Sequence, residues 1–194
     1  KKRKRNIKIN SKQWLNNYLD ATKIKDVDLI VELIGGSEGP AKKLVFNALK
    51  NKKHVVTANK ALIAKYGDQL AKIAEKNKVN LEFEASVCGG VPIIRSLKES
   101  LIANKISKIY GILNGTSNYI LSSMDRQNKN FQEMLLIAKK LGYAETNPSA
   151  GLSGDDVSGK LKILASLCFN SFLSDNIYVE GIKEIDTTDI NNAN

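Results

Sequence analysis

Apolar runs alternate with helical patterns through the first half of the chain. Apolar runs at 27–34 and 54–57, and alternating apolar residues at 80–87, predict three strands. Between them, apolar residues recur at helical spacing over 40–49 and 60–78. Strands and helices that alternate with short connections favour right-handed crossovers and a parallel, doubly wound sheet, so we expect the first run to be a buried strand.

Glycine-rich or polar segments follow each predicted strand. Ligands of doubly wound sheets bind at the carboxyl ends of the strands, so these segments predict a ligand site. No GxGxxG motif occurs in the sequence. We therefore expect a nucleotide-binding part without its first strand and glycine turn. The three segments are Gly35-Gly36, 57–60 and 84–90.

The second half of the chain has a different pattern, in which helices dominate. Two short apolar segments, 108–115 and 178–182, predict strands, which makes this half α+β. A polar loop at 145–155 precedes the last amphipathic helix. The expected helices are 92–103, 116–124, 131–141 and 156–168.

Composition excludes several classes of protein. The 194 residues are 42% hydrophobic and 26% charged, which is typical of a globular chain and excludes wholesale disorder. No apolar run approaches the roughly 18–20 residues that span a bilayer, so we expect no membrane association. Two cysteines, Cys88 and Cys168, are too few for a disulfide framework and favour a reducing, cytoplasmic location.

The net charge of +10 is concentrated at one end. The first five residues, KKRKR, are all basic and supply half of it. A nucleic-acid-binding module led by these residues is one hypothesis. The remaining sequence has no zinc-ligand spacing and no basic recognition helix. We therefore expect no nucleic-acid partner. Binding of a cofactor phosphate explains the basic residues equally well.

Asp156 and Lys160 are the strongest candidates for chemistry. They are four residues apart on a predicted helix and share one face. The loop before this helix carries Tyr143, Glu145 and Asp155. Carboxylates with one lysine suit an ammonium-bearing substrate whose carbonyl oxygen accepts a proton. A surface ion pair worth a few tenths of a kcal/mol is the alternative.

Other candidates lie at the ends of predicted strands, and each has a structural alternative. Lys60 follows the second strand, where ligands dock, but is also simply a helix start. Glu84 stands near paired glycines, where carbonyls could converge on a hard cation or form a tight turn. The Asn114-Gly115-Thr116 turn could bind an anion or cap a helix. His54 suits a structural role, and no histidine lies near Cys88 to activate a thiol nucleophile.

Six segments together resemble the homoserine dehydrogenase family, in its order and approximate spacing. The resemblance implies an NAD(P)-dependent oxidoreductase that interconverts aspartate 4-semialdehyde and L-homoserine, on the route to threonine, methionine and isoleucine, as a cytosolic homodimer. It also implies a partial Rossmann-type NAD(P)-binding domain at 1–88 and an incomplete catalytic and dimerisation domain at 89–194, so that the chain is an internal fragment. The segments are VDLIVELIGG, HVVTANKALIA, EASVCGGVPII, GILNGTSNYI, GYAETNPSAGLSGDDVSGKLKILA and VEGI.

The resemblance also implies roles for single residues. Lys160 matches the lysine that exchanges a proton with the substrate oxygen, and Lys60 matches one close to nicotinamide and substrate. Glu145, Asp156 and Tyr143 match substrate-binding positions. The expected cofactor contacts are Gly36, Lys60, Gly115 and Thr116, together with Lys2 and Arg3, which would face the 2′-phosphate and favour NADP. The backbone carbonyls of Glu84, Val87, Gly89 and Val91 match a sodium site of some members.

One departure from the family pattern concerns the substrate site. Members often have an acidic residue just after the GYAE segment, but residues 147–152, NPSAGL, contain none. Glu145, Asp155 or Asp156 would then have to supply the negative charge in its place. A catalytically inactive domain that keeps only the dimer surface is a further alternative, and we expect weak or no turnover from the chain by itself.

Overall fold

The structure is a computed structural model that describes residues 10, 13–145, 147–171 and 177–193. The chain forms two compact units, Lys1–Ser86 and Val87–Asn194. Lys2 and Arg3, the expected 2′-phosphate contacts, lie outside the described residues. None of the described helices is both long enough and apolar enough to cross a membrane.

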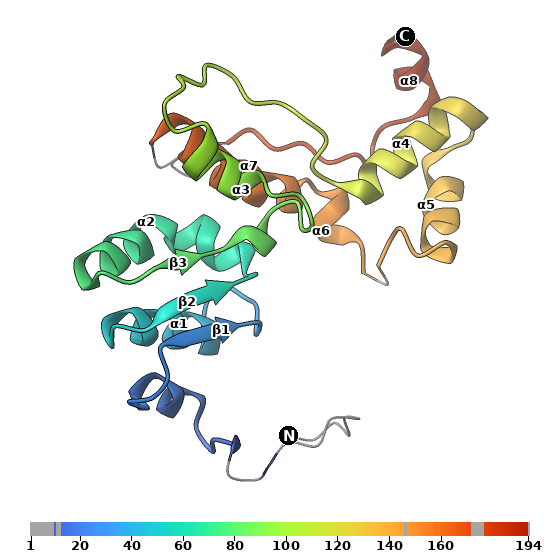
Figure 1. Cartoon of the computed structure of the whole chain (residues 1–194). Helices are drawn as coiled ribbons and strands as arrows, with labels where there is room; N and C mark the ends of the chain where they lie inside the picture. Colours follow the sequence, from blue (N-terminus) through green and yellow to red (C-terminus); the bar gives the residue numbers. More distant parts are fainter. Residues whose placement is uncertain (1–9, 11–12, 146, 172–176, 194) are drawn as a thin grey trace. The chain divides into compact units, whose positions relative to one another are not determined.

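The first unit contains the expected parallel sheet. Its strands are β1 (Leu29–Glu32), β2 (His54–Thr57) and β3 (Leu81–Glu82), in the order β1-β2-β3 (Figure 1). The helices α1 (Pro40–Lys50) and α2 (Lys60–Asn77) connect them, as the pattern predicts. A prediction of α/β architecture with parallel strands is therefore confirmed.

The helices begin where their sequences allow it. Pro40 occupies the first turn of α1, where its missing N–H costs no hydrogen bond. The Asn59 side chain caps α2 by accepting a hydrogen bond from the Leu62 N–H at 3.1 Å. Each helix then buries one apolar face. The buried residues include Leu44, Val45 and Leu49 of α1 and Leu62, Ile63 and Leu70 of α2.

The sheet alternates in burial along β1, which differs from the expected continuous burial. Ile30 is buried, whereas Leu29 and Val31 are 47% and 56% exposed. Both helices contact each other, and α1 packs on β1 and β2, so they cover the face to which Ile30 and Val55 point. On the other face Leu29, Val31 and Val56 are partly exposed.

In the described residues of the second unit every regular element is a helix, among them α3 (Ile93–Arg95), α4 (Gly115–Gln127) and α5 (Phe131–Lys140). α4 and α5 pack together around a buried cluster that includes Ile120, Met124 and Met134. A short α3 continues into a π turn at Ser96–Ser100 in place of one regular helix over 92–103. Further helices are α6 (Ser149–Leu152), α7 (Asp155–Phe169) and α8 (Thr187–Ala193).

Several local expectations are wrong. No strand forms at 108–115 or 178–182 in the described part of the chain, and residues 84–86 form a 3-10 turn that shortens the third strand. A strand requires a partner that supplies inter-strand hydrogen bonds, and the described residues place none beside either segment. α6 lies inside the segment expected as a loop, and α8 has no apolar pattern that predicts it.

Candidate active site

Lys160 and Asp156 form the centre of the site on α7. The Lys160 amine lies 2.8 Å from Oδ2 of Asp156, and the two side chains are 21% and 20% exposed. One helical turn separates the residues, so the pair shares a helix face as the sequence indicates. Partial burial weakens solvent screening, and an attraction between these charges is therefore stronger than in an exposed surface pair.

The loop before α4 holds this pair in place. The Lys160 amine also donates to the backbone carbonyl of Leu113 at 2.7 Å, across 47 residues of sequence. The Asn114 amide nitrogen donates to Oδ2 of Asp156 at 3.0 Å, while its oxygen accepts from the Ser117 N–H at 2.8 Å. Asn114 therefore caps α4 and at the same time fixes the orientation of Asp156.

A cavity of about 280 Å³ opens beside these groups. It lies at the small end of ligand-pocket volumes, which suits a metabolite of a few carbons. Its wall carries one amine and two carboxylates, so it offers both signs of charge to a zwitterion. The lining residues are Asn114, Thr116, Glu145, Asn147, Pro148, Ala150, Gly151, Asp156 and Lys160.

The structure brings most of the expected substrate groups to this cavity. Glu145, Asp156 and Lys160 line it, and so does Thr116, whose hydroxyl donates to the Tyr143 carbonyl at 2.6 Å. The Tyr143 ring stacks on Tyr119 with centroids 4.5 Å apart and does not belong to the lining. Gly115 is the first residue of α4.

Gly36 and Lys60 lie at the carboxyl end of the sheet in the first unit. Gly36 follows β1 with a φ of 81°, and Lys60 opens α2 directly after β2. Residues 33–36, which we call the glycine loop, are exposed. The amino terminus of α2 adds a partial positive charge to the same edge of the sheet. The Lys60 amine and the positive end of α2 lie at the edge of the sheet where ligands bind, and they fit the phosphate and polar groups of a nicotinamide cofactor.

The expected sodium ligands do not all belong to one unit. Glu84 lies in the 3-10 turn that ends the first unit. Val87, Gly89 and Val91 belong to the second, where the Val91 N–H donates to the Cys88 carbonyl at 2.9 Å and closes a turn. Among the described residues no group of three or more His, Cys, Asp or Glu side chains could hold a metal. Sodium binding through carbonyls stays a prediction.

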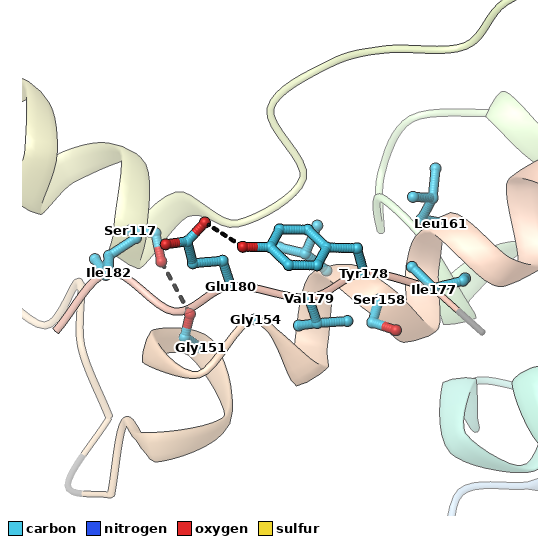
Figure 2. A pocket seen from close by; sticks show the side chains of 11 residues that line it. Ser117, Gly151, Gly154, Ser158, Leu161, Ile177, Tyr178, Val179, Glu180 and Ile182 are labelled. Carbon is cyan, nitrogen blue, oxygen red and sulfur yellow. Dashed lines mark hydrogen bonds between the residues drawn. The ribbon is translucent and has the colours of Figure 1, made fainter. Parts of the chain in front are cut away.

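A second cavity, of about 260 Å³, lies where the segment 177–182 crosses the start of α7 (Figure 2). We call this segment the strap. The Ile182 N–H donates to the Leu152 carbonyl at 2.9 Å. Two glycines permit the close approach, since a Cβ on Gly154 would lie 2.7 Å from Val179, and one on Gly181 would lie 2.7 Å from the Leu152 carbonyl oxygen. The strap therefore fixes the chain just before the helix that carries Asp156.

Some lining residues could not be identified from the sequence. Asn147, Pro148, Ala150 and Gly151 enter the cavity because α6 folds within the polar loop, and no periodic pattern predicts that short helix. The Leu113 carbonyl carries no sequence signal, because any residue has one. Asn114 had a detectable signal as a helix cap, and its bond to Asp156 is the additional finding.

Nicotinamide-dependent oxidoreductases typically have a parallel sheet that binds its ligand at the carboxyl ends of the strands. A small cavity lined by a lysine and carboxylates is also typical of them. Two family models match the chain: homoserine dehydrogenase, NAD binding domain, over residues 1–84, and homoserine dehydrogenase over residues 92–194. The chain belongs to the homoserine dehydrogenase family.

Curated relatives and solved structures extend the match. The homoserine dehydrogenase of Neisseria gonorrhoeae is 47% identical over 170 residues, which are 87% of this chain and 39% of that protein. That of Bacillus subtilis is 40% identical over 97% of this chain and 43% of its own length. The crystal structure of a homoserine dehydrogenase from Thiobacillus denitrificans matches with a TM-score of 0.86 and 44% identity, over 92% of this chain and 41% of that one. The chain thus spans about two fifths of the length of these relatives.

Proposed function

We propose that the protein containing this chain interconverts aspartate 4-semialdehyde and L-homoserine with NAD or NADP. The observation that carries the proposal is the cavity in which the Lys160 amine, Asp156 and Glu145 lie together. Family membership and the names of the relatives described above support the same activity. A homodimer, a cytoplasmic location and a place in threonine, methionine and isoleucine biosynthesis are part of this proposal.

The carboxylates would hold the amino-acid end of the substrate. Glu145 and Asp156 place negative charge on the cavity wall, where a substrate ammonium would form charge-assisted hydrogen bonds. Residues 147–152 add no third carboxylate, so binding of the ammonium would depend on these two groups. The polar atoms of Asn147 and Thr116 complete the polar lining.

Lys160 would exchange a proton with the substrate oxygen. Its amine is held between the Asp156 carboxylate and the Leu113 carbonyl, which restricts the directions in which its protons point. A bound nicotinamide cofactor would supply the hydride that reduces the semialdehyde carbonyl carbon, and Lys160 would give a proton to the oxygen. In oxidation of homoserine Lys160 takes the hydroxyl proton.

The cofactor contacts are assigned to each unit separately. In the first unit they are Gly36 and Lys60, and Lys60 would place its positive charge beside the cofactor at the carboxyl end of the sheet. In the second they are Gly115 and Thr116. A solved structure of a hyperthermophilic archaeal homoserine dehydrogenase is in complex with NADPH; it is 29% identical to this chain with a TM-score of 0.80, and the match covers 89% of this chain and 53% of that one. Lys2 and Arg3 would add a preference for NADP.

The test is Lys160→Ala in the protein that contains this chain. We expect kcat for homoserine oxidation to fall by about 10²–10⁴-fold, the usual contribution of a positioned acid or base. The dissociation constant for NADPH should change less than twofold. Lys139→Ala, on an exposed part of α5, is the matched control. Equal kcat in Lys160→Ala and the control would contradict the assignment.

A further inference from the structure

A buried carboxylate lies beneath the glycine loop, and the proposed mechanism does not use it. Glu32 is the last residue of β1 and has no exposed surface. Burying a carboxylate is costly unless hydrogen bonds replace the lost water. Such a group at the carboxyl end of a sheet therefore needs a specific set of donors.

Three donors converge on Glu32. Its Oε1 accepts from the backbone N–H groups of Ile34 at 2.6 Å and Gly35 at 2.9 Å. Its Oε2 accepts from the Thr57 hydroxyl at 2.6 Å. Thr57 is the register partner of Glu32 on β2, so the two strand ends are joined by side chains where the ladder stops. The glycine loop is thereby folded over the carboxylate.

The network continues from Thr57 into α2. The Thr57 hydroxyl accepts from the Asn59 N–H at 3.0 Å. The Asn59 side-chain oxygen caps α2 through the Leu62 N–H, and its amide nitrogen donates to the Gly36 carbonyl at 2.8 Å. Asn59 thus returns the network to the glycine loop. The result is a closed ring of hydrogen bonds from β1 through β2 and α2 to the loop.

In this ring of hydrogen bonds, which group donates and which accepts is fixed at each step. Burial opposes ionisation of Glu32, but the hydrogen bonds from Thr57, Gly35 and Ile34 outweigh it and hold the pKa of this carboxyl below its usual value. The ionised carboxylate can only accept. The Thr57 proton must therefore point to Glu32, and the Thr57 oxygen is left to accept from Asn59. This fixed polarity determines the position of each member.

We propose that Glu32, Thr57 and Asn59 are positioning residues for the nicotinamide cofactor. They hold the peptide groups of the glycine loop and the first turn of α2, where Lys60 lies, in one arrangement before the cofactor arrives. This inference rests on the proposed function only in placing a nicotinamide cofactor at this edge. Because the free loop is already ordered, binding does not have to supply that ordering.

Asn59→Ser is the sharpest test. Serine is an equally good, uncharged helix cap, but its side chain is too short to reach the Gly36 carbonyl. The variant therefore removes one bond between α2 and the loop and retains the cap. With NADPH fluorescence as the readout, we expect the dissociation constant to rise about 3–10-fold, as for loss of one hydrogen bond. Asn47→Ser on the exposed side of α1 is the matched control.

Two further variants address the other members of the ring. Thr57→Val removes the hydroxyl at nearly constant shape, and Glu32→Gln leaves an amide that can accept at one atom only, so both should weaken NADPH binding by about tenfold or more. Thr57→Ser keeps the hydroxyl and should bind NADPH within about twofold of wild type. If Thr57→Val fails to fold, Asn59→Ser still decides the question.

A positioning role differs from a purely structural one in what changes. If Asn59 has a positioning role, Asn59→Ser raises the dissociation constant for NADPH, while its KM for homoserine and its thermal midpoint stay near the wild-type values. Unchanged NADPH affinity in Asn59→Ser would overturn the inference, and so would a wild-type protein that binds neither NADPH nor NADH. A wild-type protein that binds NADPH without oxidising homoserine would refute the proposed function alone.

Discussion

Asn114 shows how one side chain serves both structure and site. Its oxygen caps α4 and its nitrogen bonds Asp156, so the amide cannot rotate by half a turn without losing both bonds. A helix cap thereby determines which way a neighbouring carboxylate points. Serine or threonine at this position would cap the helix equally well but would give up the orientation of Asp156.

Asn114→Asp should therefore impair the site without removing the cap. The new carboxylate retains the acceptor for the Ser117 N–H but places like charge against Asp156. We expect kcat/KM for homoserine to fall about 10–100-fold at pH 8, because each charge-assisted hydrogen bond contributes about 1.5–3 kcal/mol. The defect should shrink as pH falls, since the introduced carboxyl group, once protonated, could again donate to Asp156. A pH-independent defect would contradict this explanation.

Glu38 is a carboxylate whose neighbours stabilise its ionised form. Hydrogen bonds from Tyr66, Lys65 and Lys42 lower the pKa of its carboxyl from 4.5 to about 2. Stabilisation from this group is therefore complete above pH 4.5 and is lost as pH falls towards 2. An NMR titration should place the Glu38 midpoint near 2, and Tyr66→Phe should move it upwards. A midpoint near 4.5 in wild type would show that the cluster does not form in solution.

At the scale of elements, the strap and the start of α7 depend on two glycines. Figure 2 shows the strap crossing beside Gly154, with Tyr178 bonded to Glu180 and Ser117 bonded to Gly151. Under the proposed function α7 carries the reacting groups, so its first turn must be fixed, and here a separate segment fixes it. Close backbone contact, rather than a side chain, achieves this.

Gly181→Ala should loosen that contact. The added Cβ would lie 2.7 Å from the Leu152 carbonyl oxygen and 3.2 Å from Cα of Ser153, both backbone atoms that cannot rotate away. We expect a loss of about 1–3 kcal/mol in the free energy of unfolding, measured with urea, and a lower kcat. Gly111→Ala is the control, since its Cβ would meet nothing within 4 Å. Equal stability of both variants would show that the strap does not lie on this turn.

The elements that the sequence predicts well are those with strong local signals. The helices that follow Pro40, Asn59 and Asn130 have both a cap or first-turn residue and an amphipathic face. The strands expected at 108–115 and 178–182 do not form, because a short apolar segment does not specify which other segment would pair with it. A strand exists only when another segment pairs with it, and that partner is not encoded locally.

The site was predictable in part for the same reason. Asp156 and Lys160 lie within one helix, so their spacing suffices to bring them together. The Leu113 carbonyl reaches Lys160 across 47 residues, and such a contact depends on how α4 and α7 pack. Residue types at fixed spacing predict the chemistry of the site, whereas its backbone partners follow only from the fold.

At the scale of the whole molecule, the segment 101–112 is a long connection with several exposed hydrophobic side chains. Ile102 is 75% exposed, and Tyr110 and Ile112 are 86% and 74% exposed. No helix or strand includes residues 101–112, all of which the structure describes. Cleavage requires an extended, accessible backbone, so this connection should open before any helix does.

Within residues 13–145, limited trypsin digestion should therefore cut first after Lys105 or Lys108. Both lysines lie in this connection, whereas Lys65 and Lys72 lie within α2. Mass spectrometry of the early fragments would identify the site. Initial cleavage within α2 would mean that the first unit is the less stable part of the chain.

The separation of the chain into two units has an evolutionary consequence. Under the proposed function, every group that would recognise the amino acid belongs to residues 87–194, and the glycine loop with its buried ring belongs to residues 1–86. Preference for a dinucleotide and preference for an amino acid are then inherited on separate stretches of gene. Recombination near codon 86 could exchange one preference while leaving the other intact.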